Sequence, residues 1–161
     1  MIIFISGSIN SGKSTVADIV AKKIGNFALL EVDKFHEMIE WMPIDQAVPL
    51  NLENAVSTIK NFVKNNINVV VPYPLSEKNY QYILEELKDV EAEKVFFTLA
   101  PKLEIALADR GERKLTAKEK ERINYHYNIG IASPSFGEII DNSRQSPEQT
   151  AEYMISRIQK I

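Results

Sequence analysis

The feature that most constrains the fold of this chain lies at its start, where a short apolar run meets a loop bracketed by glycines. Residues 2–6, IIFIS, are rich in β-branched side chains, a pattern typical of a strand buried on both faces of a parallel sheet. Residues 7–14, GSINSGKS, follow directly, and apolar residues then recur at helical spacing up to a glycine at 25, where a helix C-cap is expected. The start of the chain therefore predicts a central strand, a tight loop and a helix.

Strand and helix patterns alternate to the end of the sequence. Strands are expected at residues 2–6, 27–33, 67–74, 94–100 and 136–143, and helices at residues 13–25, 35–42, 52–64, 76–89, 101–110, 116–128 and 146–161. Thr116 with Glu119, and Ser146 with Gln149, have the spacing of capping boxes. With no repeat or obvious linker, the sequence predicts one three-layer α/β domain over residues 1–161, with a five-stranded parallel sheet flanked by helices.

Composition narrows the classes of protein to consider. The 161 residues are 45% hydrophobic and 25% charged, which is typical of one globular domain. The formal net charge of −3 argues against a nucleic-acid partner. Apolar runs are too short to span a membrane or to act as a signal peptide, and cysteine is absent. We therefore expect no membrane partner, a cytoplasmic location, and a monomer or homodimer.

The glycine loop has the spacing of a phosphate-binding loop. Gly7, four further residues and then Gly12, Lys13 and Ser14 satisfy G-x-x-x-x-G-K-[ST] between a predicted strand and a predicted helix. Glycines allow the backbone N–H groups to converge on a β-phosphate at the positive end of the helix. The predicted nucleotide-binding residues are Gly7, Ser8, Asn10, Ser11, Gly12, Lys13, Ser14 and Thr15. Lys13 is expected to bridge the β- and γ-phosphates and Ser14 to ligate Mg²⁺, so we expect ATP and Mg²⁺ as cofactors, although ATP and GTP are not separable.

Acidic residues after the second predicted strand are candidates for the chemistry. Asp33 and Glu31 are two residues apart, so both would point to the same side of a regular strand. One carboxylate could steady the Mg²⁺ hydration shell while the other accepts a proton from an attacking hydroxyl. Asp33 and Glu31 are therefore candidates for a general base and a metal-site residue, while two acids that end a strand are also common as solvated residues. Pro72 ends the third strand, where water-using NTPases usually carry a metal-binding acid.

Four separated motifs resemble the small P-loop kinases of the shikimate kinase and nucleoside monophosphate kinase superfamily. They are GSINSGKS, VDKFHEMIEWMP, ADRGERKL and IIDNSRQSPEQTA, and together they span nearly the whole chain. The nearest similarity is to chloramphenicol phosphotransferase-like proteins. The resemblance implies that Asp33 acts as general base, that Arg110 lies against the nucleotide base and that Arg113 contacts the phosphates as a catalytic residue. It also implies that the loop at 142–146, with Arg144, borders the adenine.

The resemblance also implies a substrate region and a lid. The acceptor-binding region is expected at about 34–75 and a small helical lid at about 110–128. Aromatic and apolar residues could wall the acceptor pocket or simply belong to the core; they are Phe35, Trp41, Met42, Tyr73 and Tyr80. His36 could orient Asp33 but is interpreted as an exposed helix residue, His126 is interpreted as structural, and Arg122 is assigned to the surface.

Several functions remain open at the level of sequence. The first is an ATP- and Mg²⁺-dependent kinase that phosphorylates a hydroxyl of a small metabolite or antibiotic. A nucleoside or nucleotide kinase is a close variant, weakened because residues 34–75 contain no arginine. A nucleotide-binding regulatory or interaction protein without efficient transfer is a rival that Pro72 favours. A water-using NTPase is the third, and it lacks a clear metal-binding acid.

Overall fold

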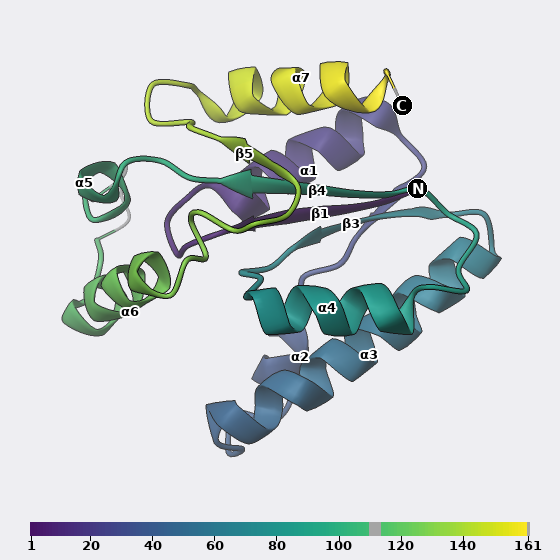
Figure 1. Cartoon of the computed structure of the whole chain (residues 1–161), viewed down its shortest axis with the longest axis horizontal. Coiled ribbons are helices and arrows are strands. Elements are labelled where there is room, and N and C mark those ends of the chain that lie inside the picture. The colour runs from purple at the N-terminus through teal and green to yellow at the C-terminus, as the bar shows by residue number, and fades with distance from the viewer. Residues whose placement is uncertain (110–113, 161) are drawn as a thin grey trace.

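The computed structural model describes residues 1–109 and 114–160, and shows a parallel sheet sandwiched between two layers of helices (Figure 1). The strands are β1 (Ile2–Gly7), β2 (Phe27–Leu29), β3 (Asn68–Pro72), β4 (Lys94–Leu99) and β5 (Glu138–Ile140). The helices are α1 (Lys13–Ile24), α2 (Asp33–Glu37), α3 (Ile44–Lys64), α4 (Glu77–Glu86), α5 (Leu103–Ala106), α6 (Ala117–Asn128) and α7 (Pro147–Ile158). All strand pairs are parallel and the order is β2-β3-β1-β4-β5, so the predicted fold class and the central first strand are confirmed.

The alternation of side chains along β1 divides the core into two halves. Ile3 and Ile5 pack with α1 and α7 on one face, whereas Ile2 and Phe4 pack with α3 and α4 on the other. All four side chains are almost completely buried, because successive residues of a strand point to opposite faces. The buried β1 carries the phosphate loop at its carboxyl end and therefore gives that loop a rigid base.

Two predicted boundaries are wrong near the second strand. β2 ends at Leu29, four residues before the predicted end, and Asp33 is the first residue of α2. Leu30 still donates its N–H to the Val70 carbonyl at 2.9 Å, but the next carbonyls, of Glu31 and Val32, accept hydrogen bonds within a local turn. Glu31 and Asp33 therefore do not lie on a regular strand, and the argument that placed both on one side of it fails.

Helix α3 begins eight residues before its predicted start and contains a proline. Pro43 stands at its N-cap and Pro49 lies inside it, on the exposed side. Proline at that position removes one intrahelical hydrogen bond, while the extra turns bury Ala47 and pack Val48 against the core. Burial of the inner face thus outweighs the lost bond. Helix α5 is also shorter than predicted, and Pro101 precedes it rather than lying in its first turn.

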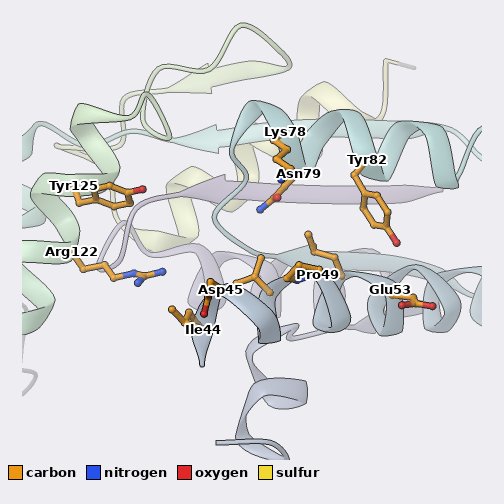
Figure 2. A pocket seen from close by; sticks show the side chains of 11 residues that line it. Ile44, Asp45, Pro49, Glu53, Lys78, Asn79, Tyr82, Arg122 and Tyr125 are labelled. Carbon is orange, nitrogen blue, oxygen red and sulfur yellow. The ribbon is translucent and has the colours of Figure 1, made fainter. Parts of the chain in front are cut away.

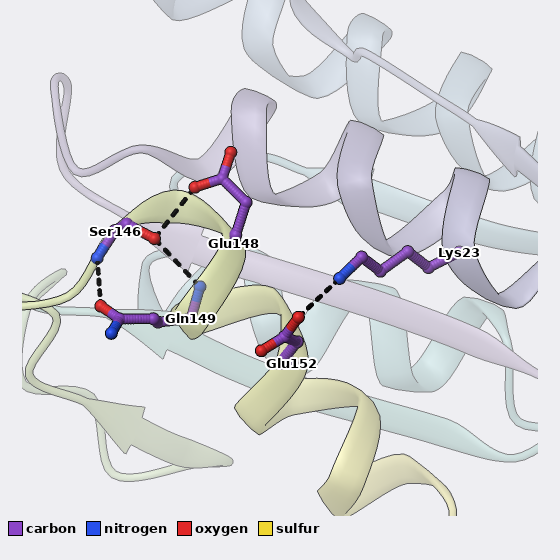
Figure 3. A network of polar contacts seen from close by, with 5 residues as sticks. All are labelled: Lys23, Ser146, Glu148, Gln149 and Glu152. Atoms are coloured by element: carbon purple, nitrogen blue, oxygen red, sulfur yellow. Dashed lines mark hydrogen bonds and ion pairs between the residues drawn. The ribbon is translucent and has the colours of Figure 1, made fainter.

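Both predicted capping boxes are confirmed. Thr116 and Glu119 exchange hydrogen bonds at the start of α6, and Ser146 and Gln149 do so at the start of α7 (Figure 3). Pro147 occupies the first helical turn of α7. Within residues 1–109 and 114–160, no helix combines the length and the hydrophobicity needed to cross a bilayer.

Candidate active site

The phosphate loop has a backbone that requires glycine at its first position. Gly7 has a φ of 137°, and a Cβ atom there would lie 2.4 Å from the Leu99 carbonyl oxygen and 2.7 Å from Ser11 Oγ. Gly12 has a φ of 94° and forms the N-cap of α1 without a side-chain hydrogen bond. Gly12 therefore offers no side-chain cap to the first N–H groups of α1, and these groups can donate hydrogen bonds to an anion.

Side chains from distant segments hold this loop in place. Asn10, in a left-handed conformation with a φ of 62°, donates to the carbonyls of Ala106 and Ala108, both at 2.9 Å. Asn142 donates to the Ser11 carbonyl at 2.9 Å. These bonds tie the loop to the end of α5, to the residues just after it and to the segment after β5, and they fix the conformation of the loop.

A cavity of about 420 Å³ lies over the cradle. It is lined by Ile9, Asn10, Gly12, Lys13, Ser14, Thr15, Asp33, Pro72 and Pro147. Lys13 Nζ donates to the Ser8 carbonyl at 2.7 Å, while Ser14 and Thr15 are exposed. Asp33 thus lines the same cavity as five of the eight predicted loop residues, namely Asn10, Gly12, Lys13, Ser14 and Thr15. Gly7, Ser8, Ser11 and Glu31 are not part of its lining.

The residues present fit a nucleoside triphosphate with Mg²⁺. The glycine cradle offers backbone N–H groups, Lys13 offers a positive charge, and Ser14 offers a hydroxyl oxygen as a metal ligand. Among the described residues no three histidine or acidic side chains cluster so as to hold a metal alone. Such a site suits Mg²⁺, which keeps several waters and binds through substrate phosphates plus one or two protein oxygens.

A second, larger cavity of about 660 Å³ opens between α3, α4 and α6 (Figure 2). Its walls combine apolar side chains of α3 with two tyrosines, two acidic residues and two basic residues. The lining residues are Ile44, Asp45, Val48, Pro49, Leu52, Glu53, Lys78, Asn79, Tyr82, Arg122 and Tyr125. Figure 2 shows Arg122 and Tyr125 reaching in from α6 at one end, with Tyr82 and Glu53 at the other. Its size is in the range of small-molecule sites.

Tyr73 is influenced by one charged residue from each of the two cavities. Its side chain is 7% exposed, and burial raises its pKa to about 12, with a further increase from the negative charge of Asp33 and an opposing effect of Arg122. Asp33 lines the phosphate cavity and Arg122 the larger one. Charges from both cavities therefore act on the same buried phenol.

The residues that sequence reasoning put forward as pocket walls do not line the larger cavity. Tyr80 stacks on Phe136 with ring centroids 3.8 Å apart, and Phe35 packs against the core. Trp41 is 79% exposed. The aromatic lining comes instead from Tyr82 and Tyr125, which lie outside the predicted acceptor region at about 34–75. Helical spacing places Tyr82 near Lys78 and Asn79 on α4, and this periodicity was the signal available in the sequence.

Two residues of α6 were interpreted from the sequence as non-functional, Arg122 as a surface residue and His126 as a structural one. Arg122 lines the larger cavity. His126 is 3% exposed, and its Nδ1 lies 3.3 Å from Ser8 Oγ in the phosphate loop. Burial, followed by the positive charges of Arg122 and Lys13, lowers the pKa of His126 to about 4. His36 Nδ1 is buried without a hydrogen-bond partner among the described residues.

The remaining nucleotide-binding predictions concern arginines. Arg110 and Arg113 lie outside the described residues. Arg144 lines a third cavity of about 320 Å³ with Lys102, Asp141, Ser143 and Gln145. There, Ser143 Oγ accepts a hydrogen bond from the Lys102 N–H at 2.8 Å, and hydrogen bonds from Ser143 lower the pKa of Asp141.

The fold of this chain is similar to that of solved kinase structures, in agreement with the predicted α/β fold class. A crystal structure of a sugar kinase from Janibacter sp. HTCC2649 matches with a TM-score of 0.76 at 19% identity, over 98% of this chain and 94% of that one. A gluconokinase from Sinorhizobium meliloti 1021 matches with a TM-score of 0.72 at 17% identity, over 98% and 93% of the two chains.

Sequence comparison gives a more direct relative. The chain is 29% identical over 163 residues to a putative adenylate kinase of Sulfurisphaera tokodaii, covering 97% of this chain and 81% of that protein. No protein-family profile matches the chain. The closer resemblance to chloramphenicol phosphotransferase-like proteins stays a prediction.

Proposed function

We propose that this protein is an ATP- and Mg²⁺-dependent phosphotransferase that moves the γ-phosphoryl group to a hydroxyl of a small molecule. The observation that carries the proposal is that Asp33 and the phosphate loop line one cavity, with the Lys13 and Ser14 side chains in the same lining. A carboxylate opposite a triphosphate cradle can accept a proton where an acceptor hydroxyl meets the γ-phosphate.

Three residues of the cavity have a role in this reaction. The acceptor oxygen forms a bond to the γ-phosphorus, the bond to the β–γ bridging oxygen breaks, and Asp33 takes the hydroxyl proton. Lys13 would leave the Ser8 carbonyl to neutralise charge on the β- and γ-phosphates, and Ser14 would hold Mg²⁺, which would offset charge on the phosphate oxygens. Because phosphoryl transfer depends mainly on positioning, the rigid cradle contributes more than the base does.

The cavity between α3, α4 and α6 is our proposed acceptor site. Arg122 in its lining and Asp33 in the phosphate cavity both act on the buried Tyr73, and its apolar floor comes from Val48 and Leu52 of α3. Tyr82 and Tyr125 offer flat faces with a hydroxyl each, while Lys78 and Arg122 offer donors to polar groups of the acceptor. A hydroxylated molecule with an apolar body fits this lining.

The test is phosphorylation of a broad panel of hydroxylated small molecules with ATP and Mg²⁺, followed by Asp33→Asn on the best acceptor. We expect Asp33→Asn to lower kcat at least a hundredfold while ATP affinity changes less than threefold. Glu31→Gln is the matched control, because Glu31 does not line the cavity. Wild-type turnover by Asp33→Asn would refute the base assignment. ATP binding without transfer to any acceptor would favour a nucleotide-binding regulatory protein.

A nucleotide acceptor is the second candidate. Two observations favour it. Residues 34–75 contain no arginine, but Lys78 and Arg122 bring two positive charges to the larger cavity. The relative with 29% identity is described as a putative adenylate kinase. Arginine and lysine are the usual ligands of phosphate groups. Including the nucleoside monophosphates and the matching nucleosides in the same panel separates the two, because a nucleotide kinase phosphorylates only the monophosphates.

A further inference from the structure

The contact between Ser8 and His126 links two segments 118 residues apart. Ser8 is fully buried and His126 is 3% exposed, so neither side chain can exchange this partner for bulk water. A buried polar group that loses its hydrogen bond carries the full cost of its desolvation. The contact is therefore a fixed point between α6 and the phosphate loop.

The same face of α6 also reaches the proposed acceptor site. Arg122, Tyr125 and His126 are spaced i, i+3 and i+4, so they lie on one side of the helix. Arg122 and Tyr125 line the larger cavity, whereas His126 contacts the loop that borders the smaller one. A shift of α6 away from Ser8 would move both cavity-lining side chains with it.

We propose that His126 is a positioning residue, whose hydrogen bond to Ser8 docks α6 on the phosphate loop and thereby sets Arg122 and Tyr125 over the acceptor cavity. The expected effect on turnover rests on the proposed function, whereas the docking of α6 on the phosphate loop does not depend on it. It assigns His126 no contact with substrate or nucleotide.

The surroundings of His126 require a neutral polar side chain. Arg122 of α6 and Lys13 of α1 both place positive charge near the ring and, together with burial, keep it unprotonated at neutral pH. A neutral imidazole can accept from the Ser8 hydroxyl or donate to it, depending on its tautomer. A lysine or arginine at position 126 would add a third positive charge, and an apolar residue would leave the buried Ser8 hydroxyl unpaired.

The first experiment needs no activity. The chain has two histidines, so His36→Gln leaves His126 as the sole imidazole for NMR titration. We expect its ring resonances to stay constant from pH 8 to pH 5 and to shift position in the Ser8→Ala background. Hydrogen exchange of the amides in residues 117–128 is expected to rise at least tenfold in His126→Leu. Titration of His126 near its ordinary value, or unchanged exchange in α6, would overturn the docking.

The second experiment separates positioning from simple folding. His126→Leu keeps the bulk without the polar atom, while His126→Asn can place an amide near the position of Nδ1. With an identified acceptor, we expect His126→Leu to raise the acceptor KM and lower kcat about tenfold each, with the ATP affinity within threefold. His126→Asn is expected to restore most of both values. Equal losses in Leu and Asn variants that remain folded, or additive effects of Ser8→Ala and His126→Leu, would contradict the proposal.

Discussion

Asn142 donates from its side-chain amide to the backbone carbonyl of Ser11 at 2.9 Å, and this bond ties the segment after β5 to the phosphate loop. Asn142 is 5% exposed. The same segment lines the Arg144 cavity and leads into the capped start of α7. Further along α7, Glu152 forms an ion pair with Lys23 of α1 (Figure 3). The loop is thus held from the side on which a nucleotide base is expected.

Asn142→Ala should weaken both stability and nucleotide binding. The variant leaves the Ser11 carbonyl without this donor, which costs about 1–3 kcal/mol for a buried group. We expect a lower midpoint in urea unfolding and a tenfold weaker affinity for ATP by calorimetry. Asn65→Ala removes a comparable but exposed amide hydrogen bond, to the Asn61 carbonyl, and should leave ATP affinity unchanged. Equal effects of both substitutions would show that the Asn142 bond has no special role.

Gly7→Ala should be far more damaging than the same change at Gly130. Both glycines have a positive φ, of 137° and 82° respectively, but a Cβ at Gly7 would lie 2.4 Å from the Leu99 carbonyl, whereas nothing lies within 4 Å at Gly130. Gly130→Ala should therefore cost about 1 kcal/mol from backbone strain alone. Gly7→Ala should lower the free energy of unfolding by more than twice that amount, measured by urea denaturation. Similar losses at both sites would contradict the tight approach of Leu99.

Arg122→Gln tests the proposed acceptor cavity. Removal of the charge at one end of this cavity should raise the KM for an anionic acceptor at least tenfold, while a neutral acceptor is affected less. Lys120→Gln is the control, because Lys120 is an exposed residue of the same helix that does not line the cavity. Steady-state kinetics with paired charged and neutral acceptors measures the effect. An unchanged KM for all acceptors would place the substrate elsewhere.

The stability of the protein should fall on mild acidification because of His126. Its pKa is lowered from 6.5 to about 4 in the folded state, so between these values the unfolded chain binds a proton that the folded chain excludes. The free energy of unfolding therefore decreases as the pH drops through this window, by about 2 kcal/mol between pH 7 and pH 5. His126→Asn should lose this part of the dependence and His36→Asn should keep it. Chemical denaturation of the three proteins at both pH values provides the comparison.

The sequence predicted the phosphate loop and the fold class because both depend on local signals. Each of these signals involves residues that are close together in the chain. They are the apolar pattern of β1, the spacing from Gly7 to Ser14, and the caps at Thr116 and Ser146. The end of β2 was less predictable from the sequence. After Leu29 the backbone can either continue the pairing with β3 or form the local turn at Glu31, and the two conformations differ little in free energy. Where an element ends depends on such balances more than on propensity.

The sequence by itself determined that a phosphate cradle follows a central buried strand, because a glycine spacing and an apolar run suffice to specify that geometry. Only the tertiary structure decided what surrounds the cradle. It brought Asp33 into the lining of the phosphate cavity, Arg122 and Tyr125 onto the larger cavity, and His126 onto Ser8. These residues are distant from one another in the chain. Their contacts depend on how α3, α4 and α6 pack, and local sequence patterns do not specify that packing.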